Sequence, residues 1–390
     1  MKKTKTGKFV RLLLFVVIIV VLYFSLKKGI GVLRSFNELR NKQETFSGDS
    51  ASLKNTVILA AFDAPLVPEK NNIWCNSFQL AWNELKDTVI REPITIIGTE
   101  DLSQRLNNSK TQKTDLTEDS YYVAAGWTSD GIIDKIRNDM ANQFPSVPLP
   151  EFDAFDVLVA YAYLESYIKF TVPFRDNDEP FIFTDSHGNT TPLKSFGVWG
   201  GSQSKYKPLR EQIDVLYCKT DENFEVVEYV LDLCKDTQPY QIVISNIAPQ
   251  GSLKGTCDQL HSKIKAFRDD PQYEDLKILQ ETDVLQVPEM FWKITHEFTE
   301  LKHKPLANQN FKGMSLSQAA QMIAFRLDRA GVTVISESYI EAACIPRLFI
   351  LNKPFLVYVK KRDAELPFFV MWVDNAELLT PFTGTVNTVQ

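Results

Sequence analysis

The chain has 390 residues and a formal net charge of −6 at pH 7, with 44% hydrophobic and 24% charged residues. These fractions are typical of a folded globular protein and exclude a largely disordered chain. The charge is unevenly distributed, because residues 1–42 hold ten Lys and Arg against one acid, whereas residues 43–390 hold 33 basic and 48 acidic side chains. Such an acidic body repels phosphate, so we expect no nucleic-acid partner.

Residues 12–26 read LLLFVVIIVVLYFSL, between Arg11 and Lys27. A helix of this length rises about 22 Å, less than the ~30 Å hydrocarbon layer, but the flanking basic side chains can snorkel to the interface. We therefore predict an uncleaved transmembrane anchor. A cleaved signal peptide has a similar pattern but needs small residues at a cleavage site, and none follows convincingly. A buried core helix is the third alternative, although it rarely carries such flanks.

The anchor sets the predicted domain organisation. Residues 1–42 are the N-terminal anchor and basic stem, 43–56 a polar linker, 57–380 the folded domain and 381–390 a polar tail. Basic residues lie on both sides of the apolar span, so the positive-inside rule does not settle its orientation. We expect a single-pass membrane protein with the acidic C-terminal domain outside the cytoplasm, the more common arrangement.

The first half of the body predicts helices. Apolar residues recur at helical spacing over 74–89, and Pro93 follows. Ser129 is a candidate N-cap for a second helix that Pro145 ends.

The second half predicts strands. Segments rich in β-branched and aromatic residues lie at 181–184, 226–234, 240–247 and 290–298, and residues 354–362 and 366–373 form a candidate hairpin. Ser252 opens a predicted helix over 253–267, and residues 317–328 fit a helix or a strand. Helices first and strands later indicate the α+β class.

No short motif identifies catalytic residues, a metal centre or a cofactor site. GxSxG, Walker and GxGxxG motifs do not occur. The five cysteines, which include Cys75 and Cys257, form no CxxC pair, and the four histidines form no close ligand pair. We expect Cys75 and Cys257 to be free buried thiols on helical faces, and the protein not to be an enzyme.

One alternative is a membrane-anchored, metal-dependent transferase. Asp176-Asn177-Asp178 has the form of a carboxylate pair that holds the phosphates of a nucleotide through a divalent cation. Against it, acidic residues among polar ones more often form a solvated loop, and no nucleotide-binding βαβ unit precedes them.

A resemblance covers residues from 163 to 373. YIKFTVPF at 167–174 is followed by FIF at 181–183, a hairpin within 228–249 and a helix over 253–267. LQVPEMFWKI at 285–294 and the two segments NKPFLVY (352–358) and PFFVM (367–371) come later. In order and spacing, these features resemble the serpin family of serine-protease inhibitors. The resemblance implies helices of the first half around a large central sheet with a second β-sheet.

The resemblance also implies a reactive loop between residues 325–331, which lie where the strand leading into such a loop should end, and the closing segment at 352–358. In that family the loop offers a bait bond to a protease, and after cleavage it inserts as a strand into the central sheet and releases stored strain. The reactive-loop candidates of this chain are Glu337, Glu341, Ala342, Ala343, Cys344 and Arg347. Arg347 is the one basic bait candidate, but we expect it to be a plain surface residue.

The loop departs from what insertion requires. Residues 332–341 read VTVISESYIE, with β-branched and bulky side chains where small ones would enter a packed sheet without clash. Only 22 residues separate Gly331 from Pro354. The resemblance therefore implies a membrane-anchored serpin-like domain, non-inhibitory and acting as a protein-binding module or scaffold, or at most protease-inhibitor-like. Its expected partner is a protease or another envelope or extracellular protein; a plain β-rich envelope-binding module remains the simplest alternative.

Overall fold

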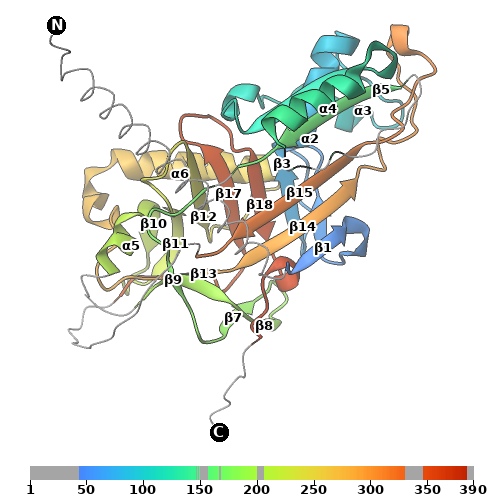
Figure 1. The fold of residues 1–390 in the computed structure, drawn as a ribbon. Helices are drawn as coiled ribbons and strands as arrows, with labels where there is room; N and C mark the ends of the chain where they lie inside the picture. The colour runs from blue at the N-terminus through green and yellow to red at the C-terminus, as the bar shows by residue number, and fades with distance from the viewer. Residues whose placement is uncertain are drawn as a thin grey trace, which may run out of the picture. The chain divides into compact units, whose positions relative to one another are not determined.

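The structure is a computed structural model, and Figure 1 shows its fold. It describes residues 44–145, 147, 149, 157–166, 168–199, 206–329 and 346–383. The predicted anchor at residues 12–26 lies outside these ranges. Within them, no helix has both the length and the apolar character needed to cross a bilayer.

A seven-stranded sheet has the strand order β10-β11-β12-β17-β18-β3-β2. Its strands are β10 (Asp214–Thr220), β11 (Val226–Asp232), β12 (Tyr240–Ser245), β17 (Phe355–Lys361), β18 (Phe369–Val373), β3 (Asn71–Cys75) and β2 (Thr56–Ile58). All neighbours are antiparallel except β2 and β3. Because β18 pairs with β3, residue Met371 lies opposite Ile73, and the two ends of the described chain meet in one sheet.

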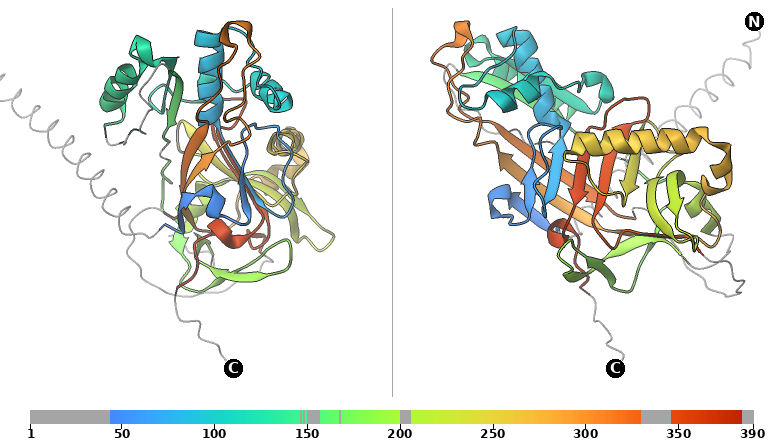
Figure 2. Two further views of the ribbon diagram at one scale, coloured as in Figure 1. Left: turned by 90° about the vertical axis from the view of Figure 1, so that its right-hand side faces the viewer. Right: turned by 180° about the vertical axis from the view of Figure 1, so that it is seen from behind.

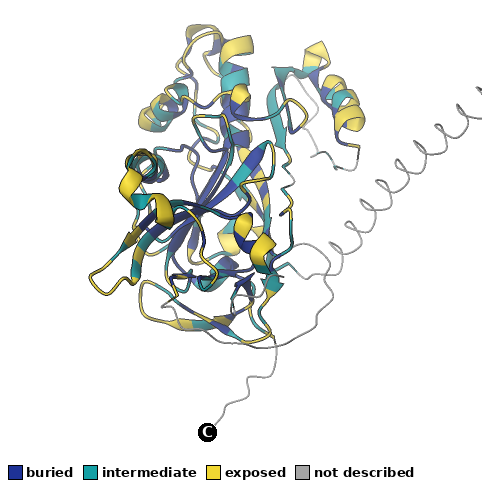
Figure 3. Ribbon diagram, turned by 90° about the vertical axis from the view of Figure 1, so that its left-hand side faces the viewer, coloured by how far each residue is buried: buried dark blue, intermediate teal, exposed yellow. Residues whose placement is uncertain are grey.

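Side chains of this sheet alternate between two cores, as the twofold repeat of a strand requires. One face packs under α6 (Leu253–Asp269), where Leu253 and Leu260 meet strand residues such as Val243 and Leu356. The alternate residues, Ile244 among them, belong to the main core on the other face. The Oγ of Ser252 accepts a hydrogen bond from the backbone N of Gly255 at 3.0 Å, so the predicted helix and its cap are confirmed. Figures 2 and 3 show α6 crossing the strands and the buried layer beneath it.

A second sheet has the order β1-β14-β15, with β1 at Phe46–Asp49, β14 at Met290–Glu297 and β15 at Ala320–Leu327. The predicted strand at 290–298 is confirmed, and the ambiguous segment 317–328 is a strand. The predicted linker at 43–56 is wrong, because β1 pairs in parallel with β14 and sets Phe46 opposite Trp292. The compact unit therefore begins at Thr45.

A third layer joins β4 (Tyr121–Trp127) and β5 (Leu158–Leu164) in an antiparallel pair under α4 (Ile132–Gln143). Ile136 and Met140 of α4 are buried against it. The predicted helix is confirmed, but its N-cap is Gly131, with φ of 80°, and not Ser129. The other predicted helix begins later than expected. α2 starts at Asn76 because Trp74 belongs to β3, and it runs to Glu84 before the π-helical turn η2 (Leu85–Ile90).

The fourth sheet, β16-β13-β9-β6, lies at the opposite side of the unit from α4 (Figure 1). Its strands are β16 (Leu348–Ile350), β13 (Val284–Pro288), β9 (Ser195–Val198) and β6 (Arg175–Asp176). The predicted strand at 181–184 is β7 (Phe181–Thr184), which pairs with β8 (Thr190–Leu193). The remaining α-helices are α3 (Glu100–Asn107) and α5 (Lys207–Glu211). Short 3₁₀ turns lie at Ser50–Ser52, Lys113–Asp115, Thr128–Asp130, Pro271–Leu276, Gln309–Phe311 and Ala376–Leu378.

The α+β prediction is confirmed, and so is the large sheet. The first half is less purely helical than expected, because β1 to β4 also come from it. Short strands such as β2, with three residues, carry too little pattern to be recognised in a sequence.

Gly197 permits the close approach of β9 and β13. A Cβ atom at this position would lie 1.9 Å from the backbone O of Leu285. We predict that Gly197→Ala lowers the free energy of unfolding by about 2–3 kcal/mol, because the two strands must separate. Urea unfolding measures the effect. Gly48→Ala in β1 is the matched control, since its Cβ would meet only the ring of Phe46, at 3.5 Å. Equal losses in both variants would contradict the prediction.

Candidate functional site: the two arginine anchors of residues 330–345

The segment predicted as a reactive loop connects two different sheets. β15 ends at Leu327, and β16 begins at Leu348. Residues 330–345 lie outside the described ranges, so five of the loop candidates stay predictions: Glu337, Glu341, Ala342, Ala343 and Cys344. The described residues on either side, Arg326 to Arg329 and Arg347, show how the ends of the segment are held.

Arg347 anchors the C-terminal end inside the protein. Its Nε lies 3.2 and 3.0 Å from the two carboxylate oxygens of Asp283, and its Nη2 lies 2.5 Å from Oδ2 of Asp283. Nη1 also donates to the backbone O of Leu276 at 3.0 Å, and Nη2 donates to the backbone O of Ile278 at 2.6 Å. A guanidinium that binds a carboxylate side-on and also donates to two backbone carbonyls is rigidly held.

This geometry corrects the expected exposure of Arg347. The residue is 9% exposed and Asp283 is 1% exposed, so Arg347 is neither a surface residue nor a presented bait. The physical reason lies in the sheet. β16 pairs in parallel with β13, setting Leu348 opposite Val284, and this pairing carries Arg347 to the acid that directly precedes β13.

The thiol of Cys218 shares this environment. Burial raises the pKa of Cys218, and the positive charge of Arg347 offsets part of that rise. A buried thiol with a raised pKa is a poor nucleophile, so Cys218 has a packing role here. Cys75 is also free and buried, but it ends a strand and is not on a helical face, whereas Cys257 lies on α6 and is partly buried.

The N-terminal end of the segment is held nearer the surface. Nη1 of Arg329 lies 2.7 Å from Oδ2 of Asp176, whose side chain is 47% exposed. Three residues earlier in the chain, Nε of Arg326 donates to Oδ2 of Asp328 at 2.7 Å. Arginine–carboxylate pairs therefore hold both ends of the segment, one pair buried and one half-exposed.

The same contacts answer the metal hypothesis. The Asp176 carboxylate is engaged by Arg329, and the described part of the chain contains no group of three or more His, Cys, Asp or Glu side chains placed to hold a metal ion. The transferase alternative built on Asp176 and Asp178 thus has no support.

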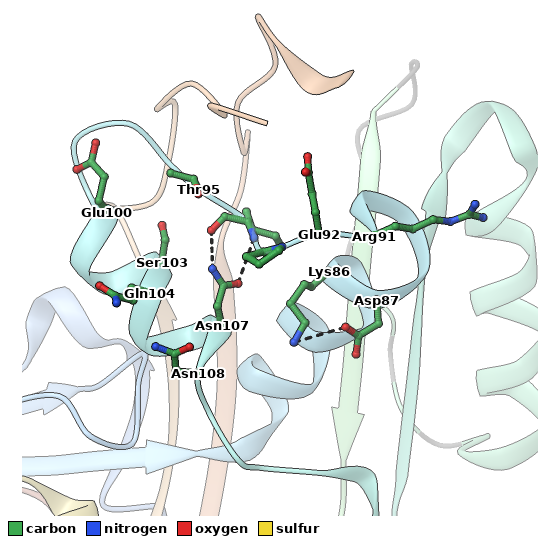
Figure 4. A pocket seen from close by; sticks show the side chains of 12 residues that line it. Lys86, Asp87, Arg91, Glu92, Thr95, Glu100, Ser103, Gln104, Asn107 and Asn108 are labelled. Atoms are coloured by element: carbon green, nitrogen blue, oxygen red, sulfur yellow. Dashed lines mark hydrogen bonds and ion pairs between the residues drawn. The ribbon is translucent and has the colours of Figure 1, made fainter. Parts of the chain in front are cut away.

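A pocket of about 730 Å³ lies between η2 and α3, away from the anchors (Figure 4). Asn107 shapes one wall, because its side chain bonds both the backbone N and the backbone O of Ile94, at 3.2 and 2.7 Å. Lys86 and Asp87 form an ion pair at 3.4 Å on another wall. The lining mixes side chains of both charges with amides.

Comparisons with known proteins find resemblance at the level of structure. No family model matches the chain, and no curated protein sequence matches it. Among solved structures, it is similar to mouse protein-Z dependent protease inhibitor, with TM-score 0.47 and 12% identity over 78% of this chain and 91% of that one. It is also similar to human thyroxine-binding globulin complexed with thyroxine, with TM-score 0.43 and 13% identity over 79% of this chain and 93% of that one.

A thermophilic serpin, Tengpin, in its native state is also similar, with TM-score 0.44 and 12% identity over 81% of this chain and 91% of that one. It carries the name of the family that the sequence resembles. All three TM-scores lie below 0.5, so the functional conclusions rest on the strand pairings and anchors of this chain itself.

Sequence reasoning found Arg347 but missed its partner. Asp283 lies 64 positions away, and nothing in its local sequence sets it apart from other acids of the body. The signal available was indirect, since the apolar strand 285–294 follows it immediately.

We predict a large difference between the two anchors. Arg347→Met should destabilise the protein by about 3–5 kcal/mol, because it leaves the carboxylate of Asp283 buried without its partner. Arg329→Met, the matched control, should cost less than about 1 kcal/mol, because its pair with Asp176 is partly solvated. Urea unfolding of both variants measures the difference. Similar losses would contradict this assignment, and Arg347→Met combined with Asp283→Leu should recover part of the stability.

Proposed function

We propose that the folded unit is a serpin-like scaffold that binds another protein and does not trap proteases. The observation that carries the proposal is the composition of the segment between the two anchors. Residues 332–335 are Val, Thr, Val and Ile, and residues 339 and 340 are Tyr and Ile. All of these side chains are β-branched or bulky. A segment that must enter a packed sheet as an extra strand needs small side chains, because packed interiors do not accommodate added volume.

The C-terminal anchor supports the same proposal. The one basic bait candidate, Arg347, is buried in an ion pair and would have to leave Asp283 to enter a protease. Breaking such a pair costs several kcal/mol. By composition, residues 332–341 between the anchors combine two acids, Glu337 and Glu341, with apolar side chains. A protease or another extracellular or envelope protein is the proposed partner.

Incubation with a panel of serine and cysteine proteases tests the proposal. We predict cleavage within residues 330–345 without a covalent, SDS-resistant complex, and a Tm that stays the same after cleavage. An inhibitory serpin-like chain would instead gain stability as the cut segment inserts.

An SDS-resistant complex with any protease, or a marked rise in Tm after cleavage, would overturn the non-inhibitory proposal. Partner binding is tested separately by pull-down from solubilised membranes with a chain that lacks residues 1–42. The test variant carries Tyr339→Ser and Ile340→Ser. It should capture less partner than the unaltered sequence if the segment makes the contact.

We also propose that residues 12–26 anchor this scaffold in a membrane, with the folded unit outside the cytoplasm. The support is the apolar run itself and its basic flanks. The acidic body, with 33 basic and 48 acidic side chains in residues 43–390, has the charge balance of a solvated domain and not of a membrane surface binder.

Extraction of membranes at alkaline pH measures the anchoring. We predict that the full chain stays in the membrane pellet and that a chain lacking residues 1–42 is released. Replacing Val17 and Ile18 by Asp should also release the full chain, because a charge at the centre of a membrane helix costs about 3 kcal/mol on insertion scales. Release of the unaltered full chain would contradict the proposal.

A further inference from the structure

The hairpin between β10 and β11 presents an aromatic side chain to solvent. Phe224, between the two strands, is 75% exposed, the largest value for a large apolar side chain among the described residues. Val227, three positions later, is 43% exposed. The hairpin lies at one edge of the seven-stranded sheet, and Figure 2 (left) shows it, in yellow-green, projecting from the body. Single exposed apolar residues are common, so the conformation of Phe224 decides whether it is unusual.

The backbone of Phe224 is left-handed, with φ of 62°. Its N–H donates to the backbone O of Asp221 at 3.1 Å, and the N–H of Asp221 donates to the backbone O of Glu225 at 2.9 Å. This is a three-residue hairpin loop, in which a turn is followed by one left-handed residue. Glycine is the favoured residue there, because a Cβ atom crowds the next carbonyl oxygen. Phe224 thus opposes the preference of its own turn, and its exposed ring gains little from burial.

The tip of the hairpin is nevertheless rigidly built. One carboxylate oxygen of Asp221, Oδ1, accepts hydrogen bonds from the backbone N of Asn223 and from that of Glu225, both at 2.9 Å. Below the tip, Cys218 of β10 lies opposite the buried Tyr229 of β11. A preorganised aromatic side chain loses little conformational entropy when a partner covers it. Strain held by a well-ordered loop at an exposed aromatic residue is typical of a functional position.

The charge around Phe224 indicates what kind of partner fits. Residues 221–225 contain three acids, Asp221, Glu222 and Glu225, and no basic residue, and all three are exposed. Lys219, the nearest base along the chain, lies opposite Glu228 in the strand ladder. An acidic rim repels anionic lipid headgroups and nucleic acid, and it attracts a surface rich in Lys and Arg.

We propose that residues 221–225 form a docking tip for a protein that offers an apolar pocket rimmed by Lys and Arg. Phe224 enters the pocket as the anchor, and the three acids meet the basic rim. An aromatic anchor of this kind supplies a large share of the binding free energy, whereas the surrounding charges set the rate and the specificity of association. The docking tip is distinct from residues 330–345, so each surface can be tested without the other.

The first test measures the conformational strain. Phe224→Gly should raise Tm by about 1–2 °C, because glycine accepts the left-handed backbone. Phe224→Ala is the matched control. It removes the ring and keeps the Cβ atom, so Tm should stay within about 1 °C of the unaltered protein. A fall in Tm of more than about 2 °C in Phe224→Ala would show that the ring stabilises the fold, and it would overturn the proposal.

The second test uses the full chain in membranes of cells that express it, with the photoreactive residue p-benzoylphenylalanine at position 224. Irradiation should give one predominant protein adduct, which is lost when the salt concentration is raised to about 500 mM. The matched control carries the same residue at position 182, because Ile182 is also exposed, at 49%, and lies on a different hairpin. It should not give this adduct. A chain that also carries Tyr339→Ser and Ile340→Ser should keep the adduct, which separates this contact from that of residues 330–345.

Calorimetry with the purified adduct partner then measures the anchor and its rim. Phe224→Gly and Phe224→Ala should each weaken binding at least about tenfold, although neither lowers Tm. Glu222→Gln combined with Glu225→Gln should weaken binding at low salt, and Ile182→Ala should leave it unchanged. Three results would overturn the proposal: a lipid adduct or no adduct at position 224, the same adduct from position 182, or unaltered affinity in Phe224→Ala.

Discussion

The insertion of the C-terminal hairpin into the middle of the seven-stranded sheet is the constraint on which the rest of the structure depends. β17 and β18 pair with each other and fill the space between β12 and β3. Without them, two strand edges and both faces lined by residues such as Met371 and Val370 would be open to water. The folded unit is therefore complete only when residues near 370 are in place. Strand β16 directly precedes β17, so the same event brings Arg347 to Asp283.

Arginine–carboxylate pairs mark the places where distant segments join. Arg362 ties the β17–β18 turn to Asp232 of β11, Arg347 ties β16 to the start of β13, and Arg329 ties the end of β15 to β6. Pairs of this kind add little net stability over apolar packing, but they penalise wrong registers heavily because a displaced partner leaves a buried charge. In this protein they fix the two ends of residues 330–345.

Local signals in the sequence worked where an element carries its own pattern. The 3.6-residue period and the Ser252 cap predicted α6, and runs of β-branched residues predicted β11, β12, β14 and the closing hairpin. They failed where a partner decides the structure. Residues 46–49 are polar enough to read as a tether and become a strand only because β14 presents an edge to them. The N-cap of α4 is Gly131 and not the expected Ser129, because the positive φ at this position suits glycine.

The sequence alone determined the charge asymmetry, the apolar run of residues 12–26, the α+β class, and the bulky composition of residues 332–341. These depend on residue type and short-range order, which a linear chain already contains. Tertiary structure decided that Arg347 is buried against Asp283 and that Asp176 pairs with Arg329. Burial and pairing arise between residues tens to hundreds of positions apart, and no local pattern encodes them.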